Sequence, residues 1–500
     1  MKTPAAALLV LLLPLAGQGA GLAAAGPAGS PGNPAAAQRA SRPGDLRFEP
    51  LRYKPPAPKS SALPNGLSVS ILEDRSLPLV EGVLVFQAGA LDDPPAAAGL
   101  AEAVGDLLRS GGTLNRPAEE VDQEIDFMGA SIDVSVGQEL TSVSFSALSR
   151  DLEKVLALVS DLVRNPAFRK DRLDLEKAQM GEEIRRRWDS PGDIAELRLE
   201  DLIYGAASRW ARRPTEHTLE PLSQRTCRAF HAAHFTPGGT RLGLAGDLNA
   251  AQARRMVETL FGRWRGPAAR PRPHEEIKGG AAAPGVYWIE RDVPQAQVAV
   301  GHLGAPRLGP DHYALEVMNL IVGSGFTSRL FREVRTARGL AYHVGGGVGE
   351  GYDRGIFRVD LQTQPPQAAA ALAAVRDVLR GLRDSPPEAE EVRLAHDRQT
   401  NRFVFNFASP GAIVEQRIYR AALGYPADYL DTYLERIQAV GAEDVRRVAR
   451  AHLQPDRLVT LVVGPESAVA PLRASGAEVR RIPLDPDTPQ TGPASRPAQP

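Results

Sequence analysis

Residues 99–113 read GLAEAVGDLLRSGGT, and this stretch says more about the fold than any other part of the chain. Its apolar residues recur at helical spacing, which predicts a helix over residues 100–108. Glu102 and Asp106 are four residues apart and therefore lie on one face of that helix. From residue types alone, these two acidic side chains are best explained as the solvated face of an amphipathic helix.

A second informative stretch, residues 328–342, reads SRLFREVRTARGLAY and contains Arg335 and Tyr342. A cation and a phenol held over a carbonyl group stabilise negative charge that develops on its oxygen. From residue types alone, a surface ion pair of Arg335 and packing of Tyr342 at the start of a strand explain the two residues better. The glycine-rich run at 345–351 lacks the signatures of phosphate and dinucleotide loops, and we interpret it as a strand and turn.

The sequence contains an internal repeat. SPGDIAELR at 190–198 recurs as SPGAIVEQR at 409–417, and AHFTP at 233–237 recurs as AHLQP at 451–455 with nearly the same separation. Two matches at one offset indicate two homologous domains of roughly 220 residues, a usual domain size. His231 and His234 are close enough in sequence to suggest a metal pair. Because no further ligand follows at suitable spacing, we interpret them as packing residues near a helix end.

The hydrophobic patterns of the two halves are similar in style. Apolar or alternating runs predict strands at residues 67–72, 79–86, 132–136, 143–145, 298–303 and 357–362. Amphipathic spacing predicts helices at residues 118–128, 152–163, 173–188, 312–322 and 367–382. Strands and helices that do not alternate strictly are typical of the α+β class.

These stretches together resemble the insulinase and pitrilysin (M16) metallopeptidases, from LPNGL at 63–67 to VVGP at 462–465. Members of that family carry an inverted zinc motif, His-x-x-Glu-His, on the helix that corresponds to residues 100–108. In this chain the two histidine positions are Glu102 and Asp106, and the position of the general base is Gly105. Glu183 resembles the third zinc ligand of the family, and Glu176 resembles an accessory glutamate.

The resemblance implies two homologous α+β domains that form a clam-like chamber, with Arg335 and Tyr342 as the substrate-binding pair of the family. Some bacterial members work as heterodimers, in which one chain carries zinc and a sister chain with a degenerate zinc motif carries the Arg and Tyr. This chain departs from the family pattern as that second chain does. We therefore expect it to bind no metal or other cofactor, to be inactive alone, and to supply Arg335 and Tyr342 in trans to a zinc-bearing sister subunit that cleaves unfolded peptides.

Two other interpretations remain open. The chain also fits a non-catalytic structural or peptide-binding homologue, like the family's core subunits of respiratory complexes, although the retained Arg335 and Tyr342 argue mildly against this. Alternatively, Glu102, Asp106 and Glu183 form a metal site themselves. Three carboxylates without an imidazole suit a hard cation rather than zinc, and no base replaces the one missing at Gly105.

Composition places broad limits on function. A chain of 500 residues is expected to form more than one domain. Its net charge of −1, from 59 basic and 60 acidic residues, provides no basic excess for binding nucleic acid. The single cysteine, Cys227, excludes an intrachain disulfide, and we interpret it as a buried structural thiol.

The N-terminus has the composition of a secretory signal, with Lys2, an apolar run at 5–15 and small residues through Ala25. The apolar run is too short to span a membrane, so we expect no membrane span after cleavage. An exported chain without disulfides fits a bacterial periplasm, or secretion. The predicted organisation is a signal peptide at 1–25, a flexible arm at 26–52, a first M16-like domain at 53–277, a linker at 278–286, a second M16-like domain at 287–484 and a disordered tail at 485–500.

Overall fold

The structure is a computed structural model that describes residues 53–268, 272–277 and 280–485. The predicted signal peptide and arm lie outside these residues, as do the first two residues of the predicted linker and all of the predicted tail except Asp485. No helix within the described ranges is long and apolar enough to cross a membrane.

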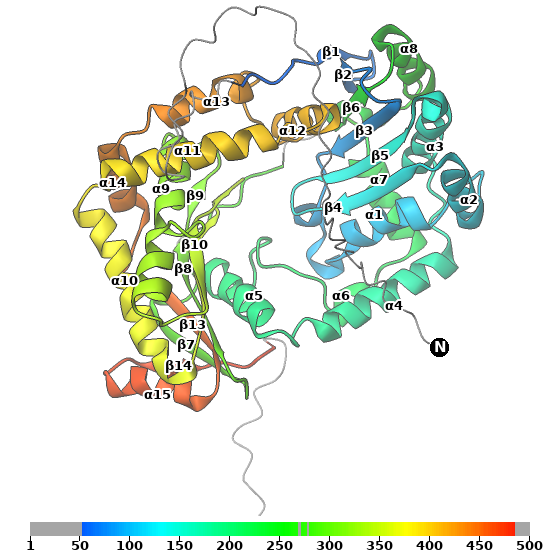
Figure 1. Cartoon of the computed structure of the whole chain (residues 1–500). Helices are drawn as coiled ribbons and strands as arrows, with labels where there is room; N and C mark the ends of the chain where they lie inside the picture. The colour runs from blue at the N-terminus through cyan, green and yellow to red at the C-terminus, as the bar shows by residue number, and fades with distance from the viewer. Residues whose placement is uncertain (1–52, 269–271, 278–279, 486–500) are drawn as a thin grey trace, which may run out of the picture. The chain divides into compact units, whose positions relative to one another are not determined.

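The first half is built on a six-stranded sheet with strand order β1-β2-β6-β3-β5-β4 (Figure 1). Its strands are β1 (Lys59–Ala62), β2 (Ser68–Glu73), β3 (Leu79–Phe86), β4 (Ser131–Val136), β5 (Thr141–Leu148) and β6 (Arg241–Gly246). Its helices are α1 (Leu100–Ser110), α2 (Ala118–Met128), α3 (Leu152–Arg164), α4 (Lys170–Arg186), α5 (Pro191–Tyr204), α6 (Glu216–Leu219), α7 (Gln224–His234) and α8 (Ala250–Phe261). Apolar side chains of α1, α2, α3, α7 and α8 form one core with this sheet.

The second half contains another six-stranded sheet, with strand order β10-β12-β8-β13-β7-β14. Its strands are β7 (Gly285–Glu290), β8 (Ala296–Leu303), β10 (His343–Val348), β12 (Ile356–Thr363), β13 (Val459–Gly464) and β14 (Val479–Arg481), and β9 (Ala305–Pro306) pairs separately with β11 (Glu350–Gly351). Its helices are α9 (His312–Val322), the π-helix η6 (Phe331–Ala337), α10 (Ala368–Asp384), α11 (Ala389–Phe405), α12 (Pro410–Ala422), α13 (Tyr429–Gln438), α14 (Ala442–His452) and α15 (Glu466–Ala474).

The two sheets share one strand plan. The order β2-β6-β3-β5-β4 of the first sheet corresponds to β7-β13-β8-β12-β10 of the second. In each plan the first pair of strands is parallel and the following pairs are antiparallel. Because corresponding strands also occur in the same order along the chain, the structure confirms the α+β class and the two homologous domains. Strand β7 begins at Gly285, inside the last two residues of the predicted linker.

The repeated SPG segments begin two helices that are exchanged between the halves. Helix α5 follows the first SPG and packs Ile194, Leu199 and Ile203 on strands β7, β8 and β13 of the second sheet. Helix α12 follows the second SPG and packs Val414 and Ile418 on strands β3 and β6 of the first sheet (Figure 1). Each sheet is therefore covered on one face by helices of its own half and on the other by a helix of the other half.

Local sequence explains how both exchanged helices start and why they pack closely. Ser190 and Ser409 each accept a backbone hydrogen bond in the first turn of their helix, and a proline follows each serine. Glycine leaves room for the contacts on both sheets. A Cβ atom at Gly243 in β6 would lie 2.3 Å from Val414 Cγ1, and one at Gly301 in β8 would lie 2.9 Å from Ile203 Cδ1.

The exchange predicts that a cavity in α5 destabilises the sheet of the other half. Leu199 is fully buried, so Leu199→Ala should lower the free energy of unfolding by about 2–5 kcal/mol. Native-state hydrogen exchange should show the largest loss of protection in β8 and β13. In the matched variant Leu158→Ala, in α3, the largest loss of amide protection should occur in the strands of the first sheet. If Leu199→Ala instead reduced amide protection more in β3 and β6 than in β8 and β13, the packing of α5 on the second sheet would be contradicted.

Candidate functional site

The N-terminus of α1 is fixed by a buried carboxylate that the sequence patterns did not single out. Asp93 accepts hydrogen bonds from the backbone N–H groups of Gly99 and Ala101, both at 2.7 Å. A carboxylate at this position compensates unpaired N–H groups and interacts favourably with the helix dipole. Burial nevertheless raises the pKa of Asp93 to about 6. The only sequence signal for this role is an acidic residue shortly before the helix.

Four acidic residues that the family resemblance assigns to zinc-site positions come together between α1 and α4. Glu102 and Asp106 lie on α1, and Glu176 and Glu183 lie on α4. Burial, followed by the negative charges of Asp106 and Glu183, raises the pKa of Glu102 to about 7. Arg187, directly after α4, has the opposite influence on Glu102.

Glu176 and Asp106 interact across the contact between the two helices, and a proton shared between them would relieve the repulsion of their charges. Glu176 is buried, and burial followed by the charge of Asp106 raises its pKa to about 7. Burial also raises the pKa of Asp106, and a hydrogen bond donated by the protonated form of Glu176 offsets part of this rise. The acidic cluster, defined as Glu102, Asp106, Glu176 and Glu183, is thus partly neutralised by protons.

The acidic cluster does not fit a zinc ion. Zinc in proteins takes mainly imidazole and thiolate ligands, and its ligands must be deprotonated. The cluster offers carboxyl groups alone, and the raised pKa of Glu176 favours a proton that a metal ion would have to displace. Within the described ranges, no group of three or more His, Cys, Asp or Glu residues is arranged to hold a metal ion.

The packing leaves no room for a side chain at Gly105, the position that corresponds to the general base of the family. Gly105 is buried in α1 against strand β4, and a Cβ atom there would lie 2.2 Å from Val136 Cγ2 and 3.5 Å from Val134 Cγ1. Side-chain atoms do not approach this closely, so a larger residue at this position requires β4 or Val136 to move. Val136 therefore fills the space in which a side chain at position 105 would begin.

Arg335 and Tyr342 lie side by side in the second half. The Arg335 guanidinium carbon is 4.6 Å from the ring centroid of Phe331 and 5.6 Å from that of Tyr342, which are cation–π contacts. The backbone N–H of Tyr342 donates to the carbonyl of Gln362 in β12, and its ring remains 69% exposed. Among the described residues, Arg335 pairs with no carboxylate. Neither a surface ion pair nor a packed tyrosine describes these residues.

The acidic cluster does not contact Arg335 and Tyr342. The acidic cluster lies on helices packed with the first sheet, whereas Arg335 and Tyr342 precede the edge strand β10 of the second. No hydrogen bond, ion pair or ring contact between described residues links them.

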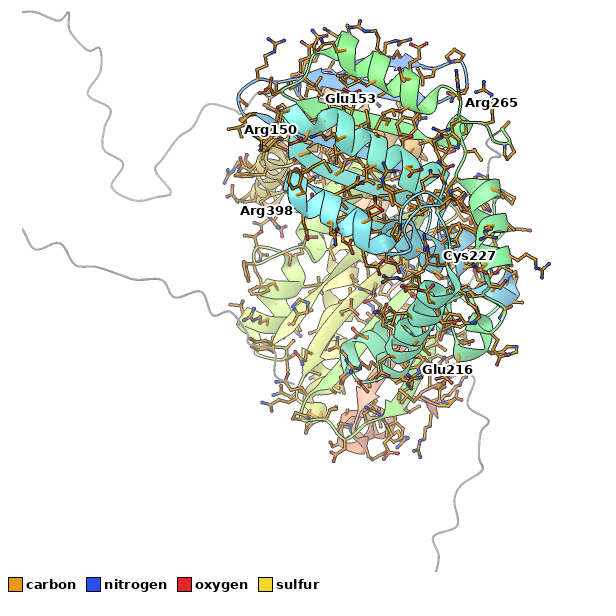
Figure 2. The ribbon with its side chains drawn as sticks, turned by 90° about the vertical axis from the view of Figure 1, so that its right-hand side faces the viewer. Arg150, Glu153, Glu216, Cys227, Arg265 and Arg398 are labelled. Carbon is orange, nitrogen blue, oxygen red and sulfur yellow. The ribbon has the colours of Figure 1, made fainter. Side chains whose placement is uncertain are left out.

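The predicted solvated face at Glu102 and Asp106 is wrong, because both residues are half-buried where α1 packs against α4, whereas the predictions for Cys227 and His231 are confirmed. Cys227, labelled in Figure 2, lies on α7 and is buried, and burial raises the pKa of its thiol to about 11. His231 lies near the end of α7 with its Nε2 atom 2.7 Å from the carbonyl oxygen of Val163, and its ring stacks on Phe235. The glycine-rich run forms most of strand β10, and its last two residues form strand β11 rather than the predicted turn.

Comparison with known proteins gives consistent matches to both halves. The family model "Insulinase (Peptidase family M16)" matches residues 70–216, and "Peptidase M16 inactive domain" matches residues 222–398. An uncharacterized zinc protease of Streptomyces coelicolor is 29% identical over 403 residues, which cover 78% of this chain and 86% of the relative. An uncharacterized zinc protease of Mycobacterium tuberculosis is 29% identical over 426 residues, which cover 82% of this chain and 94% of the relative.

Solved structures share the fold. A peptidase M16 inactive domain from Pseudomonas fluorescens superposes with a TM-score of 0.75 at 26% identity, covering 82% of this chain and 98% of that one. A protease from Helicobacter pylori superposes with a TM-score of 0.74 at 19% identity, covering 82% of this chain and 100% of that one.

The closed position at Gly105 predicts an unusual effect of alanine. Replacing glycine by alanine inside a helix ordinarily stabilises a protein by about 0.5–1 kcal/mol. We expect Gly105→Ala to lower the free energy of unfolding by roughly 1–3 kcal/mol because the new methyl group meets Val136. Adding Val136→Ala should recover part of the loss in urea denaturation.

Gly381→Ala in α10 is the control, because no atom lies within 4 Å of a Cβ built at that glycine. This variant should be more stable than the wild type. If Gly105→Ala stabilises the chain as Gly381→Ala does, the space beside Val136 is open and our account of the missing base is wrong.

The raised pKa of Glu176 predicts that stability falls with pH. The pKa is about 7 in the folded protein against an ordinary 4.5, so the folded state holds the proton more tightly than the unfolded state. The resulting stabilisation is fully present below pH 4.5 and is lost as the pH rises towards 7. Glu176→Gln keeps a hydrogen-bond donor for Asp106 at every pH. It should flatten this fall and make the chain more stable by roughly 1–2 kcal/mol at pH 8, measured by urea denaturation from pH 5 to pH 8.

Glu182→Gln on the same helix provides a control of opposite sign. The hydrogen bond from Arg185 lowers the pKa of Glu182, so its stabilising contribution is lost on acidification rather than at high pH. This control should gain nothing at pH 8. A Glu176→Gln variant that is less stable than the wild type at pH 8 would contradict proton sharing with Asp106.

Proposed function

Since this chain belongs to the M16 peptidase family, we propose that it is the zinc-free subunit of a heterodimeric M16 peptidase. In this proposal Arg335 and Tyr342 complete the active site of a zinc-bearing sister chain, and unfolded peptides are the substrates. The composition of the N-terminus supports action in a bacterial periplasm or outside the cell.

The contrast between the two groups of residues carries the proposal. The position of the general base is glycine and is closed by Val136, and the ligand positions hold carboxyl groups, among which the pKa of Glu102 is raised. By contrast, Tyr342 is exposed, and Arg335 lies beside it with a guanidinium that no described carboxylate neutralises. The chain has thus lost what hydrolysis requires and kept side chains suited to binding a substrate.

The geometry supports a specific role for each residue. The ring of Phe331 holds the Arg335 guanidinium from one side, and the backbone hydrogen bond to Gln362 holds Tyr342 at the start of the second sheet. The hydroxyl group of Tyr342 and the N–H groups of Arg335 would donate hydrogen bonds to the oxygen of the scissile carbonyl. Donors that are positioned before the reaction stabilise the charge that develops there without further reorganisation.

One observation favours a second candidate, a non-catalytic structural or peptide-binding homologue. The Arg335 guanidinium lies over two rings, an arrangement that also stabilises the π-helical segment η6 and its junction with β10. In that case the aromatic contacts of Arg335 would be its function, and turnover by a sister chain would not depend on it.

Variants of Arg335 and Tyr342 separate the two candidates. In a complex reconstituted with a zinc-bearing sister chain, Tyr342→Phe removes one donor and keeps the ring, so kcat should fall by roughly 10²–10³. Arg335→Lys keeps the charge but loses the planar fork of donors, and it should also lower kcat. Peptide hydrolysis gives kcat, and size-exclusion chromatography shows whether the two chains still associate.

Arg332→Lys is the control, because Arg332 lies in the same helical segment but pairs with Glu391. Turnover by this variant should remain near that of the wild type, and all three variants should still associate with the sister chain. Near-normal turnover in both test variants would favour the structural candidate. Hydrolysis by the lone wild-type chain that a chelator abolishes would contradict the proposed division of labour.

A further inference from the structure

A pocket of about 290 Å³ lies where the end of α5 meets the second sheet. Ile203 of α5, Leu303 of β8 and Val459 of β13 supply apolar lining, together with residues 282–284. The polar lining consists of His302, Arg354, Gln454 and Arg457. A volume near the lower end of the usual range for ligand sites, about 300–1,000 Å³, suits a small organic molecule.

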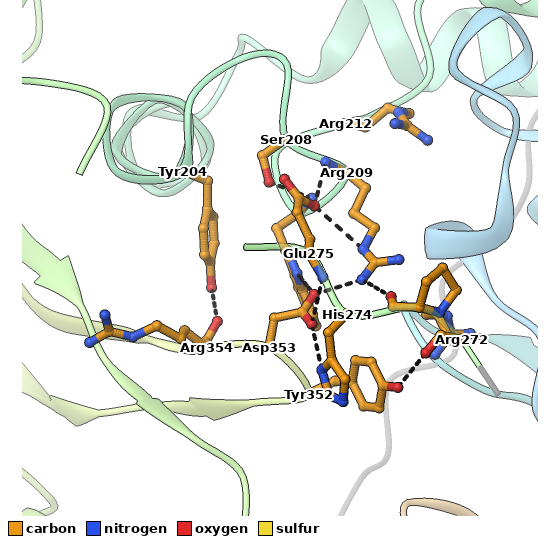
Figure 3. Close-up of polar contacts among 12 residues, drawn as sticks. Tyr204, Ser208, Arg209, Arg212, Arg272, His274, Glu275, Tyr352, Asp353 and Arg354 are labelled. Atoms are coloured by element: carbon orange, nitrogen blue, oxygen red, sulfur yellow. Dashed lines mark hydrogen bonds and ion pairs between the residues drawn. The ribbon is translucent and has the colours of Figure 1, made fainter. Parts of the chain in front are cut away.

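Arg354 presents positive charge that no neighbouring carboxylate cancels. Its Nε and Nη2 atoms donate to the carbonyl of Gly304 at 3.1 and 2.7 Å, and its Nη1 atom has no hydrogen-bond partner among the described residues. The carboxylate of the adjacent Asp353 is occupied elsewhere, by Arg209, Trp210 and His274. Figure 3 shows the Arg354 guanidinium pointing away from Asp353 and its partners.

Arg457 supplies a second cation, and no acid balances the pair. Its side chain is exposed and makes no ion pair or hydrogen bond with the described residues. No Asp or Glu lines the pocket, and the side-chain amide of Gln454 adds a further potential donor. The polar side of the pocket is therefore rich in donors and positively charged, while the remainder is apolar.

His302 is held as a neutral donor–acceptor and does not add a third charge. Its Nδ1 atom is 2.8 Å from the carbonyl oxygen of Leu303, and its Nε2 atom accepts the backbone N–H of Gln454 at 3.2 Å. Burial lowers the pKa of His302 to about 4, and the nearby charges of Arg354 and Arg457 act in the same direction. The pKa of this buried imidazole consequently depends on the charges inside the pocket.

We propose that this pocket binds an organic monocarboxylate with an apolar side chain, such as the C-terminal residue of a peptide. Guanidinium groups match a carboxylate in charge and geometry, and the apolar lining accommodates a side chain that inorganic phosphate lacks. The inference is independent of any role for Arg335 and Tyr342, because it rests on a different set of residues.

Binding of N-acetyl-leucine to the purified full chain tests the proposal. Isothermal titration calorimetry should detect binding of N-acetyl-leucine, at least tenfold weaker binding of the uncharged N-acetyl-leucinamide, and weaker binding of inorganic phosphate than of the carboxylate. Arg457→Gln should weaken binding of N-acetyl-leucine about tenfold, as expected for the loss of one charged hydrogen bond. Because Arg457 is exposed and unpaired among the described residues, this variant is expected to fold.

A second measurement locates the ligand. A carboxylate bound beside His302 should raise the pKa of this imidazole, which NMR titration of its ring protons follows directly. Arg446→Gln is the control, since Arg446 pairs with Glu443 on α14 and does not line the pocket. Equal affinity for acid and amide, equal or tighter binding of phosphate, normal binding by Arg457→Gln, or an unchanged pKa of His302 would each overturn the proposal.

Discussion

The exchange of α5 and α12 is the packing interaction on which the rest of this structure depends. Each sheet has helices of its own half on one face only. The opposite face carries buried residues such as Val83 and Val85 in the first sheet and Leu461 in the second. Without the helix from the other half, these side chains would meet water, at a cost of roughly 1.5–3 kcal/mol for each large one. The two halves therefore stabilise each other's sheets. The helices that carry the acidic cluster and the segment that carries Arg335 and Tyr342 both pack with these sheets.

Much of this architecture could be predicted because it repeats and because its patterns are local. Strand β3 and helices α2 and α9 have the predicted bounds, and the repeat predicted the two domains but not the helices α5 and α12 that begin at its SPG segments. Which sheet each helix covers could not be predicted, since an apolar face on α5 does not identify its partner. The space beside Gly105 was also beyond sequence reasoning. The sequence shows that the base is missing, but only the packing shows that Val136 fills its place. Likewise, Arg335 is an ordinary arginine until its two aromatic neighbours are seen.

The acidic cluster illustrates how a protein keeps acidic side chains together once the imidazoles are replaced. Four neighbouring carboxylates repel each other, and burial raises the cost of their charges. Here burial and mutual repulsion raise the pKa values of Glu102 and Glu176, which favours protonation, and the charge of Arg187 has the opposite influence on Glu102. Such a group tolerates proximity because it titrates near neutral pH.

The exchanged helices also set the order in which the chain can fold during synthesis. The first sheet acquires its last strand, β6, by residue 246, but the helix that covers its second face ends only at Ala422. Until the ribosome has made that helix, the nascent first half exposes an apolar sheet surface, a state that is prone to aggregate and to bind chaperones. Contacts this distant in sequence slow folding, because a long loop must close before they form. Truncation after α8 and before α12 thus leaves a first half that is fully translated and yet lacks the helix that covers its second face.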